Sequence, residues 1–135
     1  MHSYKLTDTL AVAGQISADM VAEIAAAGYQ VLLNNRPDGE ENGQPSSAEI
    51  AVAAEAEGLE YHHIPVTAMN FPGDHLGEMA DLFDDEQRPV FAFCRTGTRC
   101  TNLWVLSRED SEREQAAQLA RSIGFDLSMA ARALG

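Results

Sequence analysis

Short apolar runs alternate along the chain with helical segments, and this alternation most strongly constrains the fold. We predict strands over residues 10–14, 29–34, 59–66 and 90–93, and helices over 18–27, 46–57, 74–85, 100–108, 111–123 and 127–134. Glycines end three of these helices, at Gly28, Gly58 and Gly124. Strands that alternate with helices indicate a mainly parallel sheet. The predicted fold is therefore α/β with three layers, a central sheet of four to five strands flanked by helices.

Serines lie at several predicted helix starts, where their side chains suit the N-cap position. Ser17 is the expected cap of the first helix, and Ser46 or Ser47 the cap of the second. Ser111 and Glu114 have the spacing of a capping box.

Charge limits the partners that the chain can take. It has 135 residues, enough for one domain over residues 1–135, and 9 − 21 gives a net charge of −12. Nucleic acid and anionic membranes are therefore poor partners. Two of the nine cationic side chains, Arg95 and Arg99, flank Gly97, and this concentration favours a local anion site.

The cysteines and the N-terminus bear on the compartment. The chain has two cysteines, Cys94 and Cys100, and a disulfide between them would constrain very little of the fold. This usage favours reducing cytosol over secretion. Residues 1–6 lack the charged and apolar regions of a signal peptide, and no apolar run approaches the roughly 18 residues of a membrane span. A cytoplasmic location is expected.

Cys94 follows the apolar run 90–93 and precedes a short polar loop and a second apolar stretch, 103–106. This pattern indicates a buried strand, a loop and a helix. Backbone N–H groups and the helix dipole at such a junction lower a thiol pKa from about 8.5 to roughly 3.5–7.5 and can hold an oxyanion. Arg99, in the first helical turn, adds a two-pronged donor. The alternative is a buried structural cysteine, a common state for free Cys.

Three segments are expected to meet at the carboxyl ends of the strands, where ligands bind in α/β sheets: residues 34–41, 67–74 and 94–99. The first two supply the acidic side chains Asp38 and Asp74, which are rival general acids. Each has a simpler alternative, because Asp38 precedes a glycine as turn residues do and Asp74 is an equally good helix N-cap.

Metal and cofactor chemistry are not expected. His62 and His63 are adjacent in a predicted strand, so their side chains face opposite sides and do not easily share a metal. We therefore expect no metal site and no cofactor.

The loop over residues 94–99 resembles the active-site loops of cysteine-based phosphatases and of rhodanese-type sulfurtransferases. Together with residues 12–15, 32–40, 61–66 and 88–90, it is similar to the bacterial beta-lactamase-hydrolase-like, phosphatase-like domain family, from about residue 4 to 117. The resemblance implies a dual-specificity-phosphatase-like fold.

The loop departs from the phosphatase pattern in its length. Four residues separate Cys94 from Arg99, whereas tyrosine and dual-specificity phosphatases have five, and four is a rhodanese spacing. Position 100 is Cys rather than a hydroxyl residue, and no Asp follows Val66 directly, where the general acid of dual-specificity phosphatases would fall. The helices predicted after the loop favour the phosphatase side, since a rhodanese domain usually ends soon after its loop helix.

The first hypothesis is a phosphomonoester hydrolase, with phosphotyrosine among its substrates. The Cys94 thiolate attacks phosphorus, Arg99 and the loop N–H groups hold the equatorial oxygens, and Asp38 or Asp74 protonates the leaving group. The expected anion-binding residues are Arg95, Thr96, Gly97, Thr98 and Arg36.

Two alternatives stay open. A sulfurtransferase would carry a persulfide on Cys94, and a non-catalytic module would bind anions or sense redox state through Cys94 and Cys100. The expected partner is a phosphate- or sulfur-bearing small molecule or a phosphoprotein, with the oligomeric state left open.

Overall fold

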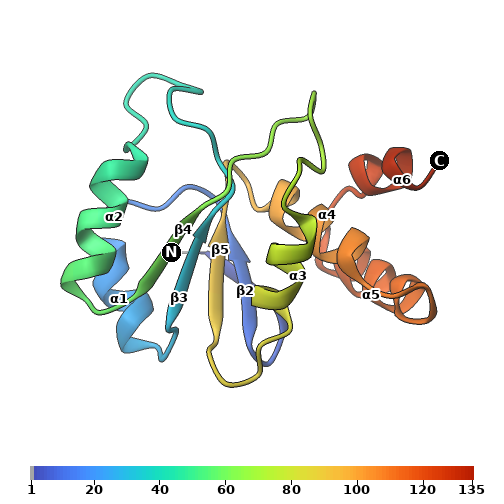
Figure 1. The fold of residues 1–135 in the computed structure, drawn as a ribbon, viewed down its shortest axis with the longest axis horizontal. Helices are drawn as coiled ribbons and strands as arrows, with labels where there is room; N and C mark the ends of the chain where they lie inside the picture. Colours follow the sequence, from blue (N-terminus) through green and yellow to red (C-terminus); the bar gives the residue numbers. More distant parts are fainter. Residues whose placement is uncertain (1) are drawn as a thin grey trace.

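A five-stranded sheet lies between two groups of helices in the computed structural model, which describes residues 2–135 (Figure 1). The strands are β1 (Ser3–Thr7), β2 (Leu10–Ala13), β3 (Val31–Asn34), β4 (Glu60–His63) and β5 (Val90–Phe93). The helices are α1 (Met20–Ala26), α2 (Ser47–Ala56), α3 (Leu76–Phe83), α4 (Thr98–Ser107), α5 (Asp110–Ile123) and α6 (Ser128–Leu134). The predicted three-layer α/β fold is confirmed.

The strand order β1-β2-β5-β3-β4 places β5 at the centre of the sheet. Strands β2, β5, β3 and β4 are parallel, and β1 pairs antiparallel with β2 at one edge. Because β5 is central and ends at Phe93, Cys94 enters the middle of the carboxyl edge, between the ends of β2 and β3. This is the edge at which α/β sheets bind ligands.

Both faces of the sheet are buried, and β5 contributes to both. Phe91 and Phe93 pack in the apolar cluster that includes residues of α1 and α2, whereas Val90 and Ala92 pack in the cluster of α3, α4, α5 and α6. Side chains alternate between the two faces of a strand, so four consecutive apolar residues are what a strand covered on both faces requires. Figure 1 shows these two helical groups on opposite sides of the sheet.

The second helix begins as the sequence predicts and the first does not. Ser46 is the N-cap of α2, and its side chain accepts a 3.1 Å hydrogen bond from the backbone N–H of Glu49. Ser17 is not the N-cap of α1, which begins at Met20 after the N-cap Asp19. The Ser17 carbonyl accepts a 3.1 Å bond from the Met20 N–H instead, so a turn precedes the helix and shortens it.

The predicted capping box at Ser111 and Glu114 is wrong. Helix α5 begins one residue earlier, at Asp110, and the side chain of its N-cap Glu109 makes no capping hydrogen bond. Ser111 therefore lies inside the first turn. Acidic side chains in that turn interact favourably with the helix dipole without capping an N–H group.

The antiparallel strand β1 was not predicted. Only Leu6 among its five residues is buried, so the segment lacks the apolar run or the clear alternation by which the other strands were recognised. Within residues 2–135 no helix combines the length and the hydropathy needed to cross a bilayer.

Candidate active site

Cys94 lies at the floor of the loop that joins β5 to α4. Its side chain has no exposed surface, and its Sγ accepts a 3.1 Å hydrogen bond from the backbone N–H of Gly97. Gly97 is the N-cap of α4, and its φ of 89° is in the left-handed region, which favours glycine. Helix α4 begins at Thr98 rather than at Cys100, so the loop is tighter than predicted and Arg99 lies in the first turn, as predicted.

A second glycine lets the loop approach β2. A Cβ atom at Gly14 would lie 2.9 Å from the carbonyl oxygen of Arg95, closer than real Cβ atoms come. The Arg95 carbonyl also accepts a 3.3 Å hydrogen bond from the N–H of Gln15. Gly14 and Gln15, which follow β2, therefore hold the loop in place by packing against and bonding to the Arg95 carbonyl.

The pKa values of the two cysteines shift in opposite directions. The Cys100 thiol lowers the pKa of Cys94 to about 6 by hydrogen bonding, with help from the backbone N–H groups of Cys100, Thr96 and Arg99 and against the opposing effect of burial. Burial, together with the Cys94 hydrogen bond, raises the pKa of Cys100 well above its usual range. Cys94 is thus the thiolate at neutral pH and Cys100 the neutral donor.

This arrangement predicts how pH dependence responds to Cys100. Activity that needs the Cys94 thiolate should show a rising limb near pH 6 in its pH profile. Cys100→Ala removes the donor, so the thiolate is less stable and the rising limb of kcat/KM should move to higher pH. Cys100→Ser keeps an O–H donor and should leave the limb closer to its original position.

The check is a pair of pH–kcat/KM profiles on one substrate, whose own ionisation cancels in the comparison. If the rising limbs of the two pH profiles coincide for Cys100→Ala and the natural protein, Cys100 does not stabilise the thiolate.

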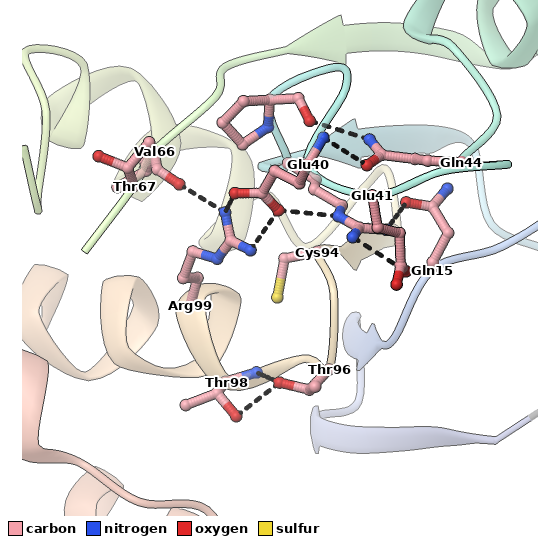
Figure 2. A network of polar contacts seen from close by, with 12 residues as sticks. Gln15, Glu40, Glu41, Gln44, Val66, Thr67, Cys94, Thr96, Thr98 and Arg99 are labelled. Atoms are coloured by element: carbon pink, nitrogen blue, oxygen red, sulfur yellow. Dashed lines mark hydrogen bonds and ion pairs between the residues drawn. The ribbon is translucent and has the colours of Figure 1, made fainter. Parts of the chain in front are cut away.

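Arg99 reaches across the site to a carboxylate from a distant loop. Its two terminal nitrogens donate to the two oxygens of Glu40, Nη1 to Oε2 at 3.0 Å and Nη2 to Oε1 at 2.7 Å. Nη1 also donates to the carbonyl oxygen of Val66 at 2.9 Å. Figure 2 shows the guanidinium directed toward Glu40, with Cys94 between Arg99 and the part of the loop that carries Thr96 and Thr98.

A second, buried arginine, Arg36, also binds Glu40. Its side chain is 1% exposed, and it donates to Glu40 at 2.8 Å, to Gln15 at 3.0 Å and to Glu41 at 3.1 Å. Hydrogen bonds from Arg99 and then Arg36 lower the pKa of Glu40, so this carboxylate is ionised between two guanidinium groups. Arg36 and Arg99 therefore bind the same carboxylate. Arg36, one of the expected anion-binding residues, does not line the pocket that opens over the loop, because its donors are already bound to Glu40, Gln15 and Glu41.

A pocket of about 450 Å³ opens over the loop. It is lined by Glu40, Ala68, Arg95, Thr96, Thr98, Arg99 and Met129. The structure thus brings together four of the predicted site residues, and the Oγ1 of Thr96 donates to that of Thr98 at 2.9 Å. Cys94 and Gly97 lie beneath this surface, both buried.

The predicted general acids lie outside the pocket lining. An Asp38 oxygen accepts a 2.8 Å bond from the N–H of Ser47 at the start of α2, and Asp74 is exposed, just before the N-cap His75 of α3. The carboxylate that lines the pocket is Glu40, which lies in the segment 34–41 expected at this edge but for which the sequence predicts no role. Its place in that segment, four residues after Arg36, is the signal in the sequence that marks it.

The described part of the chain offers no set of side chains that could bind a metal ion. Across residues 2–135, no three His, Cys, Asp or Glu side chains are grouped so that they could hold an ion. His62 bonds to Glu60 at 2.7 Å, and His63 bonds to the carbonyl of Arg36 at 2.8 Å.

Comparison with known sequences identifies a family. The sequence profile of the phosphatase-like domain of beta-lactamase hydrolase-like proteins matches residues 3–111. The beta-lactamase hydrolase-like protein of Agrobacterium fabrum is 33% identical over a match of 135 residues. The match covers 98% of this chain and 31% of that protein. The chain therefore spans about a third of the length of the curated relatives it matches.

Solved structures show the same fold. A proposed phosphatase from Neisseria meningitidis is 34% identical, with a TM-score of 0.71 and 87% of both chains covered. Tk-PTP, solved in its active form, has a TM-score of 0.72 at 20% identity, with 93% of this chain and 87% of that chain covered. The phosphatase-like fold that the sequence resemblance implies is confirmed.

Proposed function

The chain belongs to the phosphatase-like domain family of beta-lactamase hydrolase-like proteins, and from this membership and its site we propose that it is a cysteine-dependent phosphomonoester hydrolase. The observation that carries the proposal is a buried thiol with a pKa of about 6 at the floor of a loop closed by Arg99. We take residues 1–135 as one phosphatase-like domain, and phosphotyrosine as one possible substrate group.

In the proposed mechanism the Cys94 thiolate attacks phosphorus and displaces the alcohol or phenol oxygen. A sulfur–phosphorus bond forms as the phosphorus–oxygen bond breaks, and the leaving oxygen takes a proton from Asp38 or Asp74. Arg99 and the loop N–H groups hold the equatorial oxygens. A water molecule then attacks phosphorus and gives a proton to the carboxylate that the first step left. The sulfur–phosphorus bond breaks, and phosphate and the Cys94 thiolate are released. Arg95, Thr96 and Thr98 line the pocket through which the ester would enter.

Glu40 has to share Arg99 with the substrate in this mechanism. Both terminal nitrogens of Arg99 donate to Glu40 in the structure, so a phosphate dianion competes with a carboxylate for the same donors. Arg36 keeps its own bond to Glu40 at 2.8 Å, and this anchor lets the carboxylate turn away without leaving the site.

The two acids can be told apart by leaving groups. A general acid contributes roughly 10²–10⁴-fold, and a good leaving group does not need it. If Asp38 or Asp74 is the acid, its Asn variant should lose about a hundredfold in kcat on alkyl phosphates and much less on aryl phosphates. Asn at position 38 still offers an oxygen to the Ser47 N–H, so helix α2 keeps its contact.

Steady-state kinetics on an alkyl and aryl series, with each Asn variant as the control for the other, gives the answer. If neither variant shows the dependence on leaving group, the protonation step is assigned to the wrong residues.

Sulfur transfer is a second candidate, and the length of the loop favours it. With four residues between Cys94 and Arg99, the ring of N–H donors is narrower than one closed by an Arg five residues on. A single outer sulfur on Cys94 fits a narrow ring better than a phosphoryl group does. The Cys94 thiolate would take that sulfur from a donor such as thiosulfate, whose sulfur–sulfur bond breaks to release sulfite. A thiolate or cyanide would then attack the outer sulfur and leave the Cys94 thiolate, with no general acid required.

A one-residue insertion separates the two candidates. Adding Gly between Thr98 and Arg99 should raise the hydrolysis of p-nitrophenyl phosphate, which we expect to be weak in the natural protein, and lower any thiosulfate:cyanide sulfur transfer. The matched control adds Gly between Glu109 and Asp110, where α4 and α5 are joined, and leaves the loop unchanged. Brisk phosphatase activity in the natural protein that the insertion only damages would remove the main support for sulfur transfer.

A further inference from the structure

A second, smaller pocket continues the one above the loop. It has a volume of about 150 Å³, and Ala68 and Met129 line both pockets, so the two adjoin, and we call them together the groove. Phe71 adds an aromatic side chain to the wall, and Arg132 of helix α6 lines the far part. The groove thus runs from the loop of Cys94, over an apolar ledge made of Ala68, Phe71 and Met129, to a second cationic side chain.

The charges along this groove contrast with those of the chain as a whole. The sequence has nine Lys and Arg against 21 Asp and Glu, yet Arg95, Arg99 and Arg132 all line the groove. Within residues 2–135, neither Arg95 nor Arg132 forms an ion pair with a carboxylate, whereas Arg99 is paired with Glu40. The charge of Arg132 lowers the pKa of Asp126 only as the weakest of several causes. Two guanidinium groups therefore remain available to a ligand in an acidic protein.

The order of chemical groups along the groove specifies a substrate. The donors of the loop and Arg99 suit a phosphate, and the ledge suits a flat apolar body because Met129 and Phe71 offer a flexible thioether and an aromatic ring. Arg132 then suits an anion such as a carboxylate, which a guanidinium binds through two donors.

From this order, and resting on the proposed hydrolase function, we propose that the groove is a substrate subsite for small aryl phosphates that carry a second anionic group at the end remote from the phosphate. Arg132 binds the remote anion and thereby selects such esters over neutral ones of the same size.

A matched pair of esters tests the subsite. In para-(carboxymethyl)phenyl phosphate and its carboxamide analogue the methylene group insulates the phenol, so the two leaving groups are nearly equal. An exposed ion pair contributes about 0.2–1 kcal/mol, which corresponds to a preference of up to about fivefold in kcat/KM for the acid, carried mainly by KM and weakened by salt.

Variants locate that preference. Arg132→Gln should bring the ratio of the two kcat/KM values close to one, and Arg132→Glu should favour the amide. Arg121→Gln is the matched control, because Arg121 is exposed on α5 and does not line the groove, and it should keep the preference. An equal ratio in the natural protein, or a ratio that survives Arg132→Gln, would overturn the subsite.

Binding separates this result from the failure of the hydrolase proposal. The corresponding benzylphosphonates, with carboxymethyl or carbamoylmethyl groups, are titrated calorimetrically into the same proteins. If neither ester is hydrolysed but the acid phosphonate binds more tightly and loses its advantage in Arg132→Gln, the subsite stands and the hydrolase proposal fails. If the esters are hydrolysed and the phosphonates bind equally, the subsite fails and the hydrolase proposal stands.

Discussion

Cys94→Ser is expected to lower kcat by roughly a thousandfold or more, the scale of loss seen when an enzyme loses its nucleophile. The donors around Sγ lower the pKa of the Cys94 thiol to about 6. The pKa of a serine hydroxyl is so much higher that the same donors cannot ionise it at neutral pH. The loss should be the same for aryl and alkyl esters, because both need the nucleophile.

Steady-state turnover and thermal unfolding are measured together, since Cys94 is fully buried and its replacement has to leave the domain folded. Cys100→Ser is the control, because it introduces the same hydroxyl six residues along the chain, in α4, and keeps the thiol at position 94. Substantial turnover by a folded Cys94→Ser protein would show that Cys94 is not the nucleophile.

Arg99→Lys is expected to lower kcat/KM by about 10²–10³-fold, the cost of removing one donor that stabilises charge in a transition state. A lysine keeps the charge but replaces a planar pair of donors with a single ammonium group. That group cannot contact both oxygens of Glu40 and the Val66 carbonyl as the guanidinium does. Arg95→Ala should cost much less, because Arg95 is exposed at the pocket rim.

The comparison of kcat/KM between Arg99→Lys and Arg95→Ala is the measurement. Glu40→Gln serves as the control for the ion pair, since it keeps the size of the side chain while removing the charge that Arg99 binds. Equal losses for the two arginine variants would mean that the anion is held by general positive charge rather than by the fork of Arg99.

The sequence was most informative where burial alone decides the structure. The run 90–93 is apolar at every position because β5 is covered on both faces, and such a run is visible without coordinates. Strand β1 is exposed along most of its length, so its pairing with β2 left no comparable pattern. Helix starts were predicted unevenly. Ser46 has the extended backbone of an N-cap residue and accepts a bond from the Glu49 N–H, whereas the N-cap of α1 is Asp19, which has helical backbone angles and makes no capping bond.

For the site, local order along the chain was enough to place Cys94 and Arg99 at a strand-to-helix junction. The contact between Arg99 and Glu40 was out of reach, because 59 residues separate them and only the tertiary fold aims the two side chains at each other. The effect of Cys100 on the pKa of Cys94 was likewise missed, since sequence spacing does not give the direction of a thiol.

The central claim, that Cys94 forms a covalent bond to phosphorus, is tested most directly by trapping the intermediate. The protein is mixed with an aryl phosphate, quenched in acid within the first turnover, digested and analysed by mass spectrometry, with Cys94→Ser as the blank. The account predicts one phosphoryl group on the peptide that contains Cys94. A peptide that carries no phosphoryl group during turnover would contradict it.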